Sequence, residues 1–172
     1  MTVVDWVKTG VLMVVVVLLQ ISFVSPISIA GGHADLVLVT LVSVALLRGA
    51  MFGAIAGFWA GLVLDVGALQ PLGLTSLVLT LAGFWTGRFG EATTRSSPHP
   101  PLIAAALATV WAVAGSALLN FMLGQSVPGG ELFGRVLLPS IALNVLIAYP
   151  VYRGVARLYG IDQRERREPA VV

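Results

Sequence analysis

Few residues in this sequence have the side chains and spacing that catalysis or metal binding needs. The 172 residues include two histidines and no cysteine, which leaves no disulfide, thiolate metal site or cysteine nucleophile. His33 and Asp35, in the stretch HAD, could supply two metal ligands, but no third ligand lies near them in the sequence. An intramembrane aspartyl protease would need two carboxylates at depth, and only Asp65 comes close.

The chain also lacks the short motifs that accompany common reaction types. It has no GxSxG nucleophile elbow, no HExxH zinc motif and no GxGxxG or GxxxxGK phosphate loop. A lipid-modifying transferase would be expected to show a carboxylate cluster for a divalent metal, and none is apparent. We therefore expect a protein that is not an enzyme, with no cofactor and no metal site.

The composition indicates that this chain folds in a lipid bilayer. Hydrophobic residues make up 58% of it and charged residues 10%, against about 25% charged residues in a typical soluble domain. The mean hydropathy is +0.96, and a water-soluble domain of this size could not bury so much apolar surface. The basic residues are dispersed between apolar runs instead of gathered on one face, which argues against nucleic-acid binding.

Six apolar runs are candidates for membrane-spanning helices, which need about 20 residues each. The runs cover residues 7–24, 36–47, 50–66, 72–89, 102–123 and 136–158. The second run is short, and Pro139 and Pro150 are expected to bend the last one or shorten its regular part. The sequence predicts an all-α integral membrane protein, with one six-helix transmembrane domain over 1–160 and a short charged tail over 161–172.

The distribution of lysine and arginine predicts that both termini are cytoplasmic. With six spans, every basic residue except Arg135 falls on the side of the termini, which is the positive-inside pattern. This predicts a multi-pass membrane protein whose charged tail is cytoplasmic. An alternative is a cleaved signal peptide, because Lys8 and an apolar run precede the small-residue stretch SPISIA.

Two neighbouring runs carry stripes of small residues that suit close helix packing. The stripes consist of Gly49, Gly53, Gly57 and Gly61 in the third run and of Ser76, Thr80, Gly83 and Gly87 in the fourth. Membrane helices associate by close packing, which small residues on one face allow. A short turn joins the two runs, so we expect a tightly packed antiparallel hairpin. Part of the stripe could instead be open to a transmembrane helix of another protein.

Asp65 ends the third run and is followed by an outer turn that contains Gln70, Pro71 and Gly73. Near the membrane interface a carboxylate costs far less free energy than at the bilayer centre. The Asp65 carboxylate could accept hydrogen bonds from backbone N–H groups of this turn or cap the fourth helix. Recognition of a partner or a ligand is the alternative role.

Other polar residues lie toward the predicted outer ends of the helices. Asn120 and Asn144, with Gln70, either line an outward-facing pocket or form hydrogen bonds between helices. The tryptophans fall into two groups according to their predicted depth in the membrane. Trp6 and Trp85 fit interfacial positions, whereas Trp59 and Trp111 lie deeper and are expected in the core.

The stretches ADLVLVTLVSVALLRG and GFWAGLVLDVGALQPLGLTSLVLTLAGFWTG resemble the rod shape-determining protein MreD family. That family typically starts its second segment with Pro-Asp-Leu. It then has a small-residue helix ending in Gly-Leu-x-x-Asp, a short turn and Leu-Gly-Leu. The matching positions are Asp35-Leu36, Gly61-Leu62, Asp65 and Leu72-Gly73-Leu74, and the chain departs from the pattern at Ala34, where proline is typical.

The resemblance implies a non-enzymatic scaffold of the bacterial cell-wall elongation complex, located in the plasma membrane and needed for cell shape. The partners it implies are an MreC-like single-span protein, a SEDS-type glycan polymerase, its penicillin-binding transpeptidase and MreB filaments. The family is similar in fold to the substrate-binding subunits of energy-coupling-factor vitamin transporters. A second hypothesis is therefore a small-molecule binding subunit of a transporter, with a pocket near Asp65, Asn120 and Asn144.

Overall fold

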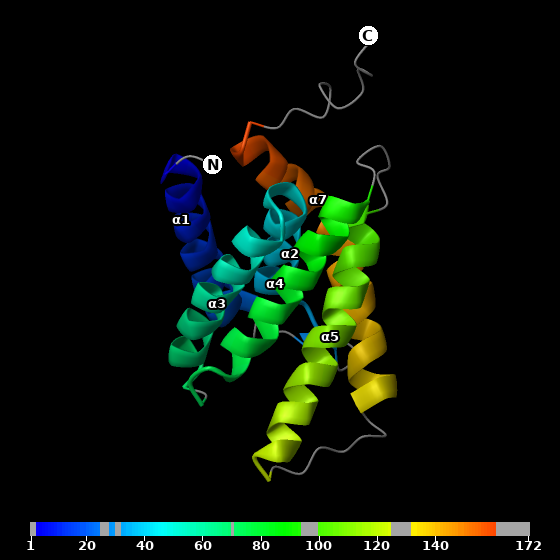
Figure 1. The fold of residues 1–172 in the computed structure, drawn as a ribbon. Helices are drawn as coiled ribbons and strands as arrows, with labels where there is room; N and C mark the ends of the chain where they lie inside the picture. Colours follow the sequence, from blue (N-terminus) through cyan, green and yellow to red (C-terminus); the bar gives the residue numbers. More distant parts are fainter. Residues whose placement is uncertain are drawn as a thin grey trace.

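The computed structural model of the protein describes residues 3–24, 28–29, 32–69, 71–93, 100–124 and 132–160. Within these residues the chain is almost entirely helical, which confirms the predicted all-α class (Figure 1). The α-helices are α1 (Val3–Leu19), α2 (Leu36–Arg48), α3 (Ala50–Gly67), α4 (Leu74–Ala92), α5 (Pro100–Met122) and α7 (Leu138–Leu158). Gln70 and the charged tail over 161–172 lie outside the described residues.

Short segments complete two of the helices and the connection before α2. The π-helical segments η1 (Gln20–Val24) and η2 (Leu132–Leu137) follow α1 and precede α7. Strand β1 (Ser28–Ile29) pairs antiparallel with β2 (Gly32–His33). Helix α7 runs through Pro150 without a break, and Pro139 lies in its first turn, where a missing backbone N–H costs no hydrogen bond.

Helix α2 forms the centre of the bundle, and every residue from Val37 to Leu47 is buried. It is in contact with α1, α3, α4, α5 and α7. Its apolar residues are not confined to one stripe, which is the pattern of a helix that is covered on all sides. With 13 residues it is about 20 Å long, whereas a bilayer core is about 30 Å thick. One end of α2 must therefore lie inside the bundle.

The described ends of the chain lie together at one end of the bundle, which we call the termini end (Figure 1). Lys8 of α1 donates a hydrogen bond to the backbone carbonyl of Leu158 at the end of α7, at 3.3 Å. The turn between α3 and α4 and the last turn of α5 lie at the opposite end. Helices α1, α3 and α5 therefore run away from the termini end, and α2, α4 and α7 run toward it.

Helices α3 and α4 form an antiparallel hairpin in which backbone meets backbone at the small residues. A Cβ atom added to Gly53 would lie 2.6 Å from the carbonyl oxygen of Gly83, and one on Gly57 would overlap the carbonyl oxygen of Leu79. A Cβ atom on Gly61 would overlap the backbone of Ser76. The structure thus places these three glycines inside the hairpin, where α4 covers them and no partner helix can reach them.

The remaining small residues of the two stripes lie in the same contact or next to it. Gly83 and Gly87 face the backbone of Gly53 and Ala50. Thr80 is partly buried and donates its hydroxyl to the Ser76 carbonyl within α4, at 2.6 Å. The small residues at these positions allow the backbones of α3 and α4 to approach each other closely.

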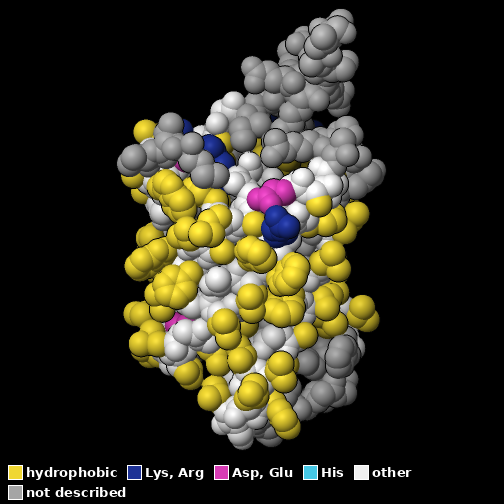
Figure 2. Space-filling view, in the orientation of Figure 1, with side chains coloured by type: hydrophobic (Ala, Val, Ile, Leu, Met, Phe, Trp, Pro, Cys, Tyr) yellow, Lys and Arg dark blue, Asp and Glu magenta, His cyan; other side chains and the backbone are white. Residues whose placement is uncertain are grey.

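The outer surface of the bundle is apolar, as expected of a chain surrounded by lipid. Figure 2 shows hydrophobic side chains over most of the face drawn. Among the residues that the structure describes, four helical stretches are long and apolar enough to cross a membrane, namely Val4–Ser22, Ala50–Gly67, Pro100–Met122 and Leu138–Leu158. Helix α2 is shorter than these, and α4 carries Arg88 and Glu91 near the termini end.

The expectation that Trp59 and Trp111 are core residues is wrong. Trp59 is 62% exposed and Trp111 is 40% exposed. In α3 the small residues take the inward face, and Trp59 lies two positions after Gly57, about 200° around the helix. Close packing at the glycines therefore turns this indole outward. Trp85 is 61% exposed and stands in the same relation to Gly83 in α4.

We expect the substitution Gly57→Ala to destabilise the protein, because the new methyl group forces α3 away from the Leu79 carbonyl. Overpacking of this kind costs about 1–3 kcal/mol. Thermal unfolding in detergent measures the loss. Gly154→Ala is the matched control, because a Cβ atom there meets nothing within 4 Å. Equal unfolding temperatures for the two variants would contradict the close approach of α3 and α4.

Candidate functional site

Asp65 caps the start of α4 from the end of α3. Its carboxylate accepts hydrogen bonds from the backbone N–H of Gly73 at 2.8 Å and of Thr75 at 3.1 Å. Asp65 is 1% exposed, and Gly73 and Thr75 are partly buried, so the carboxylate supplies partners to two N–H groups at the helix start. Gly73 adopts a φ of 95°, which glycine tolerates best, and Pro71 lies exposed in the same turn. The carboxylate thus fixes the turn that joins the hairpin.

Glu91 performs the same role at the other end of the hairpin. It lies near the end of α4 and accepts a hydrogen bond from the backbone N–H of Ala50, the first residue of α3, at 2.8 Å. The preceding Gly49 has a φ of 92°, and a Cβ atom there would lie 2.6 Å from the Glu91 carboxylate. Glycine at this position therefore allows both the chain reversal and the cap. Sequence reasoning did not single out Glu91.

The two helices are related by an internal repeat of 26 residues. The stretch AGFWAG begins at Ala56 and AGFWTG begins at Ala82, and Asp65 and Glu91 differ by the same offset. The packing repeats too, because Gly57 meets Leu79 as Gly83 meets Gly53. The hairpin therefore has an approximate two-fold axis, with each helix capping the other. Comparing the two runs with each other would have revealed Glu91 as the counterpart of Asp65.

A buried polar cluster surrounds the first turn of α2, the end that lies inside the bundle. Gln20 of η1 accepts a hydrogen bond from the Leu36 backbone N–H at 2.9 Å and donates one to the Ala34 carbonyl at 3.1 Å. Asp35 is the N-cap, and its carboxylate accepts from the Leu38 N–H at 2.8 Å. These side chains supply the partners that water would give to a helix end at the protein surface.

Asn144 of α7 links this cluster to two further helices. Its side-chain oxygen accepts from the Asp35 N–H at 2.8 Å, and its amide group donates to the Thr109 hydroxyl of α5 at 3.0 Å. Asn144 is 1% exposed. Ser140, one turn earlier in α7, accepts from the backbone N–H of His33 at 3.0 Å. The cluster therefore fastens the connection before α2 to α5 and α7.

The structure does not bring Asn120 and Asn144 together in one pocket. Asn144 lies in the buried cluster with both ends of its amide bonded. Asn120 is partly exposed on α5, eleven residues after Thr109, or about 16 Å along the helix axis. Asp65 belongs to the α3–α4 turn. Of the two roles open to Asn144, the geometry corresponds to hydrogen bonding between helices.

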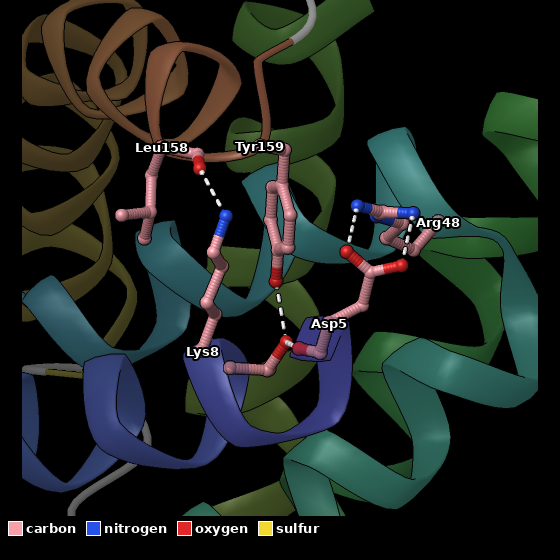
Figure 3. A network of polar contacts seen from close by, with 6 residues as sticks. Asp5, Lys8, Arg48, Leu158 and Tyr159 are labelled. Carbon is pink, nitrogen blue, oxygen red and sulfur yellow. Dashed lines mark hydrogen bonds and ion pairs between the residues drawn. The ribbon is translucent and has the colours of Figure 1, made fainter. Parts of the chain in front are cut away.

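A second polar cluster holds the helices together at the termini end (Figure 3). Arg48, the last residue of α2, forms a bidentate ion pair with Asp5 of α1, with N–O distances of 2.7 and 3.0 Å. Its guanidinium also lies 4.3 Å from the ring centroid of Tyr159, just after α7. One arginine thus joins three helices, using the planar fork and the flat face that lysine lacks.

Tyr159 completes this cluster through its hydroxyl group. The hydroxyl forms a hydrogen bond with Thr9 of α1, and Thr9 also donates to the Asp5 carbonyl at 2.7 Å. Burial raises the pKa of Tyr159, while the bond with Thr9 and the charge of Arg48 lower it. The phenol therefore stays protonated at neutral pH and can act as a donor.

These polar side chains cap helices and bond them to one another. Among the residues that the structure describes, no group of three or more metal-ligating side chains lies close enough to hold a metal ion. Such a fold and such sites define a helical membrane protein whose described polar contacts stabilise its own architecture. The profile of the rod shape-determining protein MreD family matches residues 1–160, and the chain belongs to this family.

The family places the protein among rod shape-determining membrane proteins, as its sequence motifs led us to expect. No curated protein and no solved structure matches the chain significantly. The match spans all the described helices, so the hairpin and both polar clusters are features of an MreD-family bundle.

We expect Asp65→Asn to lower the free energy of unfolding by about 1–3 kcal/mol, because one of the two partly buried N–H groups that Asp65 bonds loses its acceptor. Glu91→Gln is the matched control, since the Glu91 side chain is partly exposed and water can replace the lost contact. Chemical unfolding in detergent, followed by tryptophan fluorescence, measures both. A smaller loss for Asp65→Asn than for Glu91→Gln would contradict the assigned caps.

Proposed function

We propose that this protein is a non-enzymatic scaffold subunit of the bacterial rod complex, in which it binds an MreC-like single-span protein and supports the peptidoglycan synthases. Family membership carries this proposal. The geometry agrees with it, because Asp65, Asn144 and Arg48 all serve as structural links between helices. A scaffold needs a rigid bundle with a constant outer shape, and these buried links supply rigidity.

The same proposal includes six membrane spans in the plasma membrane, with both termini in the cytoplasm. The described basic side chains support this orientation, because Lys8, Arg48, Arg88 and Arg157 all belong to helix ends at the termini end. Arg135, in η2, belongs to the opposite end of the bundle. In this orientation α2 crosses together with the connection that precedes it, and not as a complete span of its own.

The absence of native cysteine makes this orientation directly testable by single cysteine substitutions. Ala92, at the end of α4, and Met122, at the end of α5, are both exposed and lie at opposite ends of the bundle. We expect Met122→Cys to react with a membrane-impermeant maleimide on intact spheroplasts and Ala92→Cys to react only after lysis. The reverse pattern would mean that the termini are extracytoplasmic.

Co-purification from the native host tests the scaffold function itself. The tagged protein is extracted in a gentle detergent, and the proteins retained with it are identified by mass spectrometry. We expect an MreC-like protein together with a SEDS-type polymerase and a penicillin-binding transpeptidase. An unrelated tagged membrane protein with several spans, expressed at the same level, controls for proteins that bind any bundle.

A different set of partners would overturn the proposal. Recovery of paired ATPases with a coupling subunit would identify a substrate-binding subunit of a vitamin-type transporter instead. That alternative required an outer pocket lined by Asn120 and Asn144, and the structure places these two side chains apart. We therefore propose no second function.

A further inference from the structure

Two exposed arginines lie one turn apart on α7, close to the termini end (Figure 1). Arg157 is in the last turn of the helix, and Arg153 precedes it by four residues. Side chains at this spacing lie on the same helix face, with Cβ atoms about 5–6 Å apart. Two guanidinium groups at that separation can reach one small anion together.

The same face of α7 is apolar further from the termini end. Pro150 and Leu146 continue the spacing of three and four residues, and both are exposed, Leu146 to 74%. With 21 residues, α7 is about 31 Å long, which matches the thickness of a bilayer core. The apolar part of the face therefore lies against acyl chains, and the two arginines lie where the acyl chains meet the headgroups.

The two arginines of α7 differ from the other basic side chains that the structure describes, each of which has an acceptor. Arg48 pairs with Asp5, and Arg88 pairs with Glu91. Lys8 donates to a backbone carbonyl. Among the described residues, no carboxylate or carbonyl accepts a hydrogen bond from either arginine of α7. Two positive charges without such partners, at the edge of a bilayer, favour an anion.

Arg153 repeats a geometry with which the protein holds an oxyanion elsewhere. Its guanidinium lies 4.4 Å from the ring centroid of Tyr149. The Arg48 guanidinium lies 4.3 Å from the ring centroid of Tyr159, and its N–H edge binds the Asp5 carboxylate through two hydrogen bonds (Figure 3). A ring that stacks on the flat face of a guanidinium leaves the edge free to donate. Arg153 is thus oriented to bind two oxygens of an anion.

We propose that Arg153 and Arg157 form a binding site for the phosphate group of an anionic phospholipid, with Tyr149 holding the first guanidinium in place. A phosphate presents two oxygens in the geometry that a guanidinium fork prefers. The two unneutralised charges favour a headgroup with a net negative charge over a zwitterionic one. This inference rests on the depth of α7 in the bilayer and not on the proposed scaffold function.

Native mass spectrometry of lipid binding tests the proposal. The purified and delipidated protein is titrated in detergent with dioleoylphosphatidylglycerol and, separately, with dioleoylphosphatidylcholine, so that the acyl chains are the same. We expect the first phosphatidylglycerol to bind at least fivefold more tightly than phosphatidylcholine, because each arginine near an anionic headgroup contributes roughly a fivefold gain in affinity. Equal affinities for the two lipids would overturn the proposal.

The variant Arg153→Gln removes one guanidinium from the site. Arg88→Gln is the matched control, because Arg88 belongs to the termini end of α4, has a side chain that is 64% exposed, and is paired with Glu91. We expect Arg153→Gln to weaken binding of the first phosphatidylglycerol roughly fivefold and Arg88→Gln to weaken it less than about twofold. Equal losses would show that the lipid responds only to net charge, and would overturn the proposed site.

Arg153→Lys separates the guanidinium geometry from the charge. Lysine keeps the positive charge but lacks the planar fork and the flat face that stacks on Tyr149. We expect phosphatidylglycerol to bind roughly threefold more weakly, because an ammonium group binds phosphate as a point charge without the second aligned hydrogen bond. Binding as tight as that of the unaltered protein would contradict an oriented guanidinium at this site.

Discussion

Helix starts that lie in apolar surroundings must have their backbone N–H groups bonded by the protein itself, and this constraint explains the positions of Gln20 and Asp65. Lipid offers no hydrogen-bond partners, so each unpaired backbone N–H group in the bilayer core costs on the order of several kcal/mol of free energy. Helices α2 and α4 meet the constraint with side chains from other elements, Gln20 for α2 and Asp65 for α4. Glu91 caps α3 in the same way at the termini end, where its side chain is partly exposed.

The same constraint explains why a helix as short as α2 can occupy the centre. Its first turn is bonded by η1 and α7, and its last residue is fixed by α1 and Tyr159. Both ends are thus tied to helices that lie on different sides of it. The five surrounding helices then pack against α2 along its buried length, from Val37 to Leu47. Its position follows from these bonds as much as from its apolar side chains.

Local spacing predicted the parts of the fold that depend on one or two neighbouring elements. The helix positions, the hairpin, and Asp65 as an acceptor at the outer turn all follow from periodicity and from a short connection. The outward orientation of Trp59 could not be predicted in this way, because the depth of a residue along a helix does not say on which face the small residues lie. The bonds of Asn144 to Thr109 and Asp35 also escaped prediction, since they join positions 35 and 109 residues apart.

The role of Glu91 and the two-fold relation of the hairpin required a comparison of the sequence with itself. Asp65 reads as a cap because a turn follows it, whereas Glu91 is followed by residues that give no such signal. The repeat removes this difference, since a two-fold axis turns a cap at one end of the hairpin into a cap at the other. Repeats of this length are easily overlooked among Gly, Ala and Leu, which recur in every membrane helix.

The use of polar groups inside the bundle determines how its outer surface can be recognised within the membrane. The buried polar side chains are already bonded within the bundle as caps and links. A partner in the membrane can therefore recognise the lipid-facing surface mainly by its shape. Lipid is as apolar as that surface, so expulsion from water cannot drive association there. Selectivity between one partner and another must then come from how well surfaces interlock. A rigid hairpin with outward-facing Trp59 and Trp85 has an outer surface of constant shape, which a loosely packed bundle could not maintain.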